Sequence, residues 1–247
     1  PLAQTFFVDE SEHSRGIFLQ SLHLCFSEKD DTLPITIQIR PTKNGNPHPS
    51  AIIPFSERVV YPSDIVIDPL YPTAITRINF SSPVFLEPGE YAICFVTNSR
   101  DYKLYTATVG QNELSQSTTA INRIQKPVYG GNLFRPQNTN IAQPDFTKDI
   151  KFTLTRCNFS TSGTKQITFT SPIDVNHSSN LLRFNSTIMT PSGTGKSINE
   201  TNLLNNISLE ENTNVKIPAT SVSSSAGTFV VTMNNGTNEV SPVIDTL

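Results

Sequence analysis

The sequence has 247 residues, of which 36% are hydrophobic and 16% are charged, with 18 prolines, 11 glycines and no tryptophan. This composition favours many short strands joined by turns and argues against a helical bundle. The net charge of -3 argues against a general nucleic-acid binder, which would carry a basic face.

The first third of the chain predicts a series of strands. Residues 4–8 are a short apolar run that we place at a sheet edge, and residues 17–26 alternate in their second half. In residues 35–39 isoleucine alternates with polar residues, which is typical of a strand with one buried face. Asn44 and Gly45 then predict a tight turn, because both residue types tolerate positive φ.

Residues 85–96 predict the central strand of the fold. Before them, residues 50–73 are rich in proline and predict edge segments or ordered loop. Pro88 and Gly89 predict a type II turn, because proline presets φ at the second position and glycine supplies positive φ at the third. After this turn both faces of the strand are apolar, so it is predicted to be covered on both sides and to form the middle of a β-sandwich.

The rest of the first domain is also predicted to consist of strands joined by loops. Residues 102–109 predict a strand, residues 110–126 are polar with room for a short helix, residues 128–140 predict a loop, and residues 150–154 predict the last strand. The three cysteines are too few and too widely spaced for a disulfide framework, and we interpret them as small core residues: Cys25, Cys94 and Cys157.

The composition changes near residues 158–163. Beyond this point serine, threonine and asparagine dominate, which is too polar for a thick core. We therefore predict a jelly-roll-like β-sandwich over residues 1–159. Residues 160–247 are predicted to be a small polar β domain, or part of one completed by neighbouring chain segments, with strands at 166–170, 181–189, 215–217 and 228–233.

Several short motifs are weighed as sites of chemistry. Gly195-Lys196-Ser197 resembles the end of a phosphate-binding loop, but Thr190 stands where that loop needs its first glycine and no helix is predicted to follow. No two of the four histidines have a metal-ligand spacing. We therefore predict no cofactor, no metal site and no catalytic residues.

Acidic and aromatic residues leave two alternatives open. The cluster of Glu28, Asp30 and Asp31 is compatible with a calcium site, but a solvated acidic turn is favoured because the EF-hand pattern is absent. Exposed aromatic side chains can stack on sugar rings, so three tyrosines are candidates for binding a glycan, although packing within the protein is favoured: Tyr102, Tyr105 and Tyr129.

Taken in order, several segments resemble a jelly-roll module of large baseplate-wedge and tail-fibre-network proteins of contractile-tailed bacteriophages, those of cyanobacteria especially. The resemblance is carried by residues 1–6, 16–19, 33–41, the Asn44-Gly45 turn, 82–93, 151–156 and, at the end, 241–245. It covers most of residues 1–159 and only patches thereafter. It transfers no catalytic residues.

The resemblance implies a non-enzymatic virion structural module that mediates protein–protein assembly in a phage tail baseplate, made in the host cytoplasm. The implied partners are other tail or baseplate proteins, in a homo- or hetero-oligomer. The alternative is a carbohydrate- or receptor-binding sandwich of a tail fibre or tailspike that recognises a host-surface glycan. No apolar run approaches the roughly 20 residues of a membrane span. The chain opens on Pro1 without a signal-peptide pattern, and we interpret it as a piece of a longer polypeptide.

Overall fold

The computed structural model describes residues 2–114, 122–125, 130–135, 144–170, 181–183, 185, 187–200, 207–210, 212, 214–216 and 226–246. These residues form antiparallel β-ladders, and the helical element among them is a short 3-10 turn, η1 (Pro62–Asp64). The prediction of an all-β fold is therefore confirmed. Within the described residues, no helix has the length and apolarity that crossing a membrane requires. Contacts divide the chain into two compact units, Pro1–Cys157 and Asn158–Leu247.

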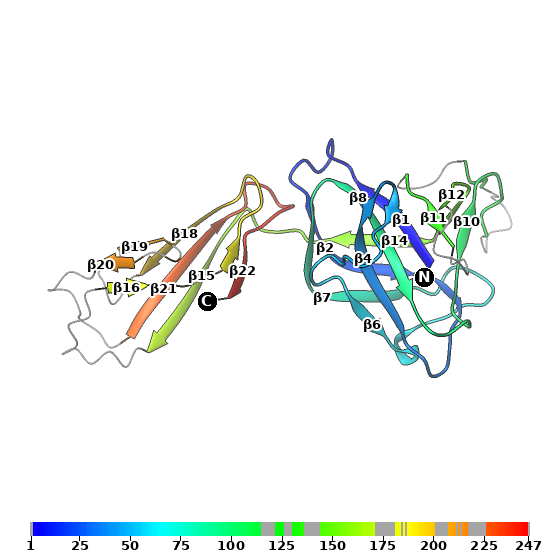
Figure 1. Cartoon of the computed structure of the whole chain (residues 1–247), viewed down its shortest axis with the longest axis horizontal. Helices are drawn as coiled ribbons and strands as arrows, with labels where there is room; N and C mark the ends of the chain where they lie inside the picture. The colour runs from blue at the N-terminus through cyan, green and yellow to red at the C-terminus, as the bar shows by residue number, and fades with distance from the viewer. Residues whose placement is uncertain are drawn as a thin grey trace. The chain divides into compact units, whose positions relative to one another are not determined.

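The larger sheet of the first unit has seven strands, with β1 and β8 at its centre (Figure 1). Its strands are β12 (Pro144–Asp145), β11 (Leu133–Phe134), β1 (Leu2–Val8), β8 (Gly89–Val96) and β4 (Ile35–Lys43), followed by β5 (Asn46–Pro47) and β6 (Arg58–Val60), which both pair with β4.

The second sheet of this unit has three strands, and in Figure 1 they run across the direction of β1, β4 and β8. They are β14 (Phe152–Arg156), β2 (Ile17–Leu24) and β7 (Thr76–Leu86). Along the sequence the chain alternates between the sheets, from β1 to β2, β4, β7, β8 and finally β14. This alternation brings distant segments together in two layers, as a sandwich requires. Two further pairs are β3 (Phe26–Glu28) with β9 (Lys103–Leu104), and β10 (Thr106–Thr108) with β13 (Lys148–Ile150).

The main core of the first unit contains side chains from both sheets. Strand β8 contributes Ile93 and Phe95 to it, while the alternate residues Ala92 and Cys94 are buried on the other face beside Phe134. The prediction that this strand is covered on both sides is confirmed. The alternation of residues 35–39 is also confirmed, because Ile35, Ile37 and Ile39 are all buried in this core.

Two predictions about position in the sheet are wrong. Strand β1 is not at an edge, because it pairs with β8 on one side and with β11 on the other. Within the segment predicted to be a loop, Leu133 and Phe134 form β11 and are almost fully buried. Both errors have one cause: β11 reaches β1 from about 130 positions away in the chain, and a local pattern contains no information about such pairing.

Of the two predicted turns, one is confirmed and one is wrong. Asn44 and Gly45 have φ of 54° and 73° and connect β4 to β5, which confirms that tight turn. Pro88 and Gly89 do not form the predicted type II turn: Pro88 is a bend, and Gly89 has a φ of 153° as the first residue of β8. The reason is that β7 and β8 belong to different sheets, so the chain crosses between layers here and does not form a hairpin.

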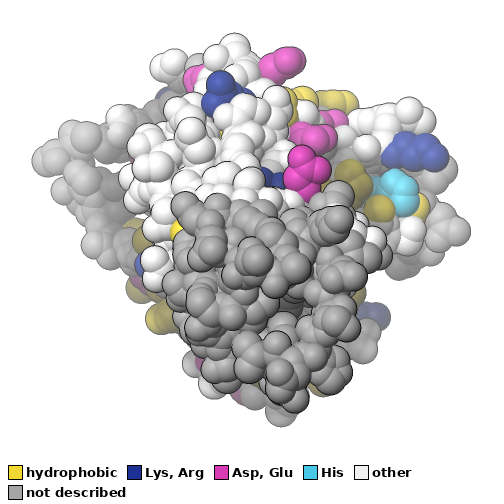
Figure 2. Space-filling model, turned by 90° about the vertical axis from the view of Figure 1, so that its left-hand side faces the viewer, with side chains coloured by type: hydrophobic (Ala, Val, Ile, Leu, Met, Phe, Trp, Pro, Cys, Tyr) yellow, Lys and Arg dark blue, Asp and Glu magenta, His cyan; other side chains and the backbone are white. Residues whose placement is uncertain are grey.

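The second unit is built around one four-stranded sheet. Its strands are β15 (Ser162–Thr170), β21 (Ala226–Asn234), β18 (Gly195–Glu200) and β19 (Ile207–Leu209). Two small pairs accompany it: β16 (Leu181–Arg183) with β20 (Asn214–Lys216), and β17 (Thr187–Met189) with β22 (Val243–Thr246). In the part that the structure describes, the buried cluster of this unit is small: Ile198, Leu209 and Val231. Figure 2 shows one face of the molecule, whose described surface is largely white, the colour of backbone and uncharged polar side chains.

Candidate functional site: a groove beside Asp149

A groove of about 560 Å³ opens beside the β10–β13 pair in the first unit. Pro72, Tyr105 and Phe152 contribute apolar and aromatic surface to it, and Asp149 and Lys151 contribute charge. Its volume lies within the range of small-molecule sites, which combine apolar walls with a few polar groups. The groove is therefore the candidate binding site of this unit.

Asp149 is the most buried charged residue of the groove, with 8% of its surface exposed. Its Oδ1 atom accepts a hydrogen bond of 2.7 Å from Gln4 Nε2. Gln4 Oε1 in turn accepts the backbone N–H of Ile150 at 2.9 Å, so the amide of Gln4 bridges β1 and β13. Burial raises the pKa of Asp149, the Gln4 hydrogen bond opposes this shift, and the nearby Asp145 carboxylate adds to it.

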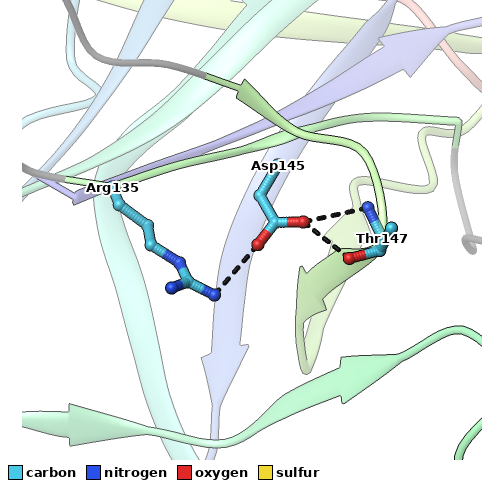
Figure 3. A network of polar contacts seen from close by, with 3 residues as sticks. All are labelled: Arg135, Asp145 and Thr147. Carbon is cyan, nitrogen blue, oxygen red and sulfur yellow. Dashed lines mark hydrogen bonds and ion pairs between the residues drawn. The ribbon is translucent and has the colours of Figure 1, made fainter.

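Asp145 organises the turn that precedes Asp149 (Figure 3). Its Oδ2 atom lies 2.9 Å from Arg135 Nη2, while Oδ1 accepts hydrogen bonds from Thr147 N at 3.1 Å and from Thr147 Oγ1 at 2.7 Å. In Figure 3 Arg135 and Thr147 lie on opposite sides of the carboxylate. These contacts tie β11 to the turn between β12 and β13, and so fix the start of the strand that carries Asp149.

Residues 111–114 and Ile124 line the groove, and residues 110–113 lie beside residues 122–124. They are held together by backbone hydrogen bonds from Gly110 to Ile124, from Ile124 to Gln111 and from Glu113 to Asn122. Arg123 Nε also donates to Gly110 O at 2.8 Å. The described part of residues 110–126 is thus an antiparallel pair and contains no helix.

The three tyrosines that were candidates for glycan stacking do not share one site. Tyr105 lines the groove, and its hydroxyl donates a hydrogen bond of 2.6 Å to Asp68 O. Tyr102 packs against the main core, meets Phe26 in an edge-to-face contact and donates its hydroxyl to Leu33 O, away from the groove lining. Tyr129 lies outside the described residues. Of the three, Tyr105 is the one that the structure places at a cavity.

The other sequence motifs have local structural roles. Gly195 begins strand β18, so no helix follows Lys196 and Ser197 and the geometry of a phosphate-binding loop is not formed. Asp30 Oδ1 accepts backbone N–H groups from Thr32 and Leu33, both at 2.7 Å. The described residues contain no group of three or more side chains arranged to hold a metal ion.

Histidines and cysteines also act locally. His48 Nδ1 accepts the backbone N–H of Ala51 at 2.8 Å and so caps a turn. Cys25 and Cys94 are buried, as predicted, whereas Cys157 is half-buried. Burial raises the pKa of the Cys94 thiol to about 11, which keeps it protonated and unreactive at neutral pH.

Gln4 and Asp149 are site residues that the sequence patterns do not reveal. Gln4 interrupts the apolar run of residues 2–8, and a polar residue at an inward position of a strand signals a buried hydrogen-bond partner. Asp149 directly precedes the strand pattern of Ile150, Phe152 and Leu154. Their contact spans 145 positions, so neither local pattern identifies the other residue.

Comparison with protein-family models, curated proteins and solved structures finds no match to this chain.

Proposed function

We propose that this chain is a non-enzymatic structural module of a contractile phage tail, belonging to a baseplate-wedge or fibre-attachment protein, and that it mediates protein–protein assembly. The proposal combines the resemblance described above with one feature of the first unit: the exposed apolar side chains along residues 52–75, here called the apolar segment. Its exposed large hydrophobic residues are Ile52, Phe55, Val59, Tyr61, Val66, Ile67, Leu70 and Ile75.

The apolar segment is held to the sandwich by its polar groups. The buried hydroxyl of Ser56 accepts Ile39 N at 3.2 Å and lies within hydrogen-bond distance of Ile39 O and Ile53 O. Lys29 Nζ donates to Pro62 O at 2.7 Å and to Ile65 O at 2.8 Å. The segment therefore presents its apolar side chains from a fixed backbone, which lowers the entropy lost when a partner binds.

The backbone conformation and the exposure of Phe55 are the main support for the proposal. It has a φ of 65°, in the left-handed region, where a bulky side chain costs about 1–2 kcal/mol. The residue is nevertheless 56% exposed, so the strain is not offset by burial within the chain. Strained and exposed aromatic residues are typical of surfaces that function in contact with a partner.

The second unit supports the same proposal through its small core. A sheet needs burial of one face to be stable alone, and the described buried cluster of this unit contains three residues. We propose that neighbouring chains complete this unit. Residues 160–247 expressed alone are then expected to lack a cooperative thermal transition as a monomer. A cooperative melt of the monomeric fragment would show that no partner is needed.

The assembly role is tested by incorporation into particles. The double variant Phe55→Ser, Leu70→Ser removes two exposed apolar side chains from the apolar segment. The control Phe146→Ser removes the side chain of a residue that is 68% exposed and lies outside the apolar segment. Each gene is supplied in trans to a phage that lacks it, and the chain is quantified by mass spectrometry in purified particles. We expect at least about a tenfold loss for the double variant, since central interface side chains contribute about 2 kcal/mol each. We expect no loss for Phe146→Ser.

Two results would overturn the proposal. One is the absence of the wild-type chain from purified particles. The other is equal incorporation of the double variant and the Phe146→Ser control. Thermal unfolding of each purified variant shows whether an effect arises from the surface, because replacing exposed side chains usually changes stability by less than about 0.5 kcal/mol.

A further inference from the structure

We propose that the groove beside Asp149 binds a neutral saccharide, with Asp149 Oδ2 accepting hydrogen bonds from sugar hydroxyls and the ring of Tyr105 packing against the C–H face of the sugar. This activity is additional to the assembly role proposed above and does not depend on it.

Asp149 Oδ2 is the atom that indicates a ligand. Gln4 occupies Oδ1, whereas within the described residues no donor binds Oδ2. In the same part of the chain, the fully enclosed side-chain atom that lacks a partner is Asn235 Oδ1, so Asp149 Oδ2 is not fully enclosed, and Asp149 is one of the residues that line the groove. A carboxylate oxygen with restricted access to water gains more from a ligand hydroxyl than an exposed one does, because less hydration must be displaced.

The remaining lining suits a polyhydroxyl ligand. Gln111 contributes an amide group to the lining, and apolar surface comes from Ile124 and Phe152. A sugar has hydroxyls at its rim that both donate and accept, and C–H groups on its faces. Small-molecule sites of this kind combine mainly apolar walls with a few convergent polar groups.

The charges of the groove favour a neutral ligand over an anion. Glu113 and Lys151 line it with opposite signs, in addition to Asp149. Lys151 Nζ donates to Pro72 O at 2.9 Å, which places its positive charge beside the groove wall. Two acids against one lysine leave the lining with a negative excess, which disfavours an anionic ligand, while Lys151 offsets part of the attraction for a cation.

Tyr105 provides a fixed wall for such a ligand. Its hydroxyl donates to Asp68 O, its backbone N–H donates to Cys25 O at 3.1 Å, and its carbonyl accepts Lys151 N at 2.9 Å. These three contacts hold the ring without using its face. An aromatic ring held in this way contributes contact area with little loss of conformational entropy on binding.

The first experiment identifies the ligand class. The full chain is applied to an array of neutral oligosaccharides of glucose, galactose, mannose and N-acetylglucosamine, together with sialylated glycans, and each hit is measured by isothermal titration. We expect saturable binding to at least one neutral oligosaccharide. The absence of neutral binding at millimolar sugar, or binding restricted to sialylated glycans, would overturn the proposal.

The second experiment assigns the binding to the groove. Asp149→Asn keeps an oxygen for Gln4 but replaces the Oδ2 acceptor by a donor, so Kd is expected to rise by about tenfold or more. Tyr105→Leu removes the aromatic wall and is expected to raise Kd by a similar factor. Tyr105→Phe keeps the ring and is expected to have a Kd close to that of the wild type. The matched control Asp101→Asn changes an exposed acid outside the groove lining and is expected to leave Kd unchanged.

The outcomes also separate this proposal from the assembly role. Asp149→Asn is expected to lose sugar binding while still entering particles at the wild-type level. Unchanged Kd in folded Asp149→Asn and Tyr105→Leu would place the ligand elsewhere and overturn the groove assignment. Thermal unfolding of each variant confirms that the protein under test is folded.

Discussion

Gln4 Nε2 donates a hydrogen bond of 2.7 Å to Asp149 Oδ1, which joins the first strand of the chain to a residue 145 positions later. Gln4 is 1% exposed, so this bond forms where water does not compete effectively. The amide of Gln4 thus sets the position of the carboxylate that we assign to ligand binding. It also connects the larger sheet to the β10–β13 pair that borders the groove.

Replacing Gln4 is expected to destabilise the first unit. Gln4→Leu leaves Asp149 Oδ1 and the backbone N–H of Ile150 without their partner, and unsatisfied buried groups cost about 2–3 kcal/mol together. The control is Gln20→Leu, because Gln20 is an exposed residue of β2, the next strand along the chain. Urea unfolding of both variants measures the difference. Equal midpoints for the two variants would show that the buried bridge contributes nothing.

The titration of Asp149 predicts how stability depends on pH. Its pKa is raised in the folded state, so the folded protein holds this proton more tightly than the unfolded chain does. This contribution is present below the unfolded pKa, near about 4, and is lost as pH rises through the folded pKa. Asp149→Asn removes the loss, so we expect the variant to become progressively more stable than the wild type as pH rises from 4 to 7.

The measurement for Asp149 is urea unfolding of both proteins at a series of pH values. A difference in unfolding free energy that is constant with pH would contradict the predicted titration. Asp149→Asn is thus expected to gain stability and to lose sugar affinity. Such a trade-off is common at functional sites, where a buried charge needed for binding lowers the stability of the fold.

Asp30 predicts the opposite pH dependence. Its carboxylate is hydrogen-bonded by Ser99, Leu33 and Thr32, and these bonds lower its pKa. The stabilisation is present above the unfolded pKa, near about 4, and is lost as pH falls towards the folded pKa. Asp30→Asn is therefore expected to lower Tm at pH 7 and to approach the wild type in acid, as measured by thermal unfolding. The neighbouring exposed Asp31→Asn is the control, and an equal loss in both variants would exclude a specific role for Asp30.

Gly131 is expected to tolerate no side chain. A Cβ atom at this position would lie 1.7 Å from Thr5 O, because the chain passes against β1, where Thr5 N donates to Asn132 O at 3.0 Å. Gly131→Ala must displace backbone and is expected to cost about 2–3 kcal/mol in urea unfolding. Gly45→Asn is the control: no atom lies within 4 Å of its added Cβ, and asparagine tolerates the positive φ of that turn. Similar stability of the two variants would contradict the close approach.

Local patterns predicted which faces of the strands are buried. The apolar alternation of Ile35, Ile37 and Ile39 and the two apolar faces of β8 correspond to buried positions in the structure. The Asn44-Gly45 turn was predictable for a similar reason, since it depends on the conformational freedom of two adjacent residues. Such features depend on neighbours within a few positions, and the sequence contains all of that information.

The sequence by itself determined the fold class and the main strands of the first unit, and it gave three candidate tyrosines without selecting Tyr105 among them. Tertiary structure decided that β1 is an interior strand, that the bend at Pro88 joins two sheets, and that Gln4 meets Asp149 beside a groove. These properties arise from pairings between segments that lie far apart in the chain. Periodicity indicates that a side chain is buried, but only the folded arrangement of the sheets selects the residue buried next to it.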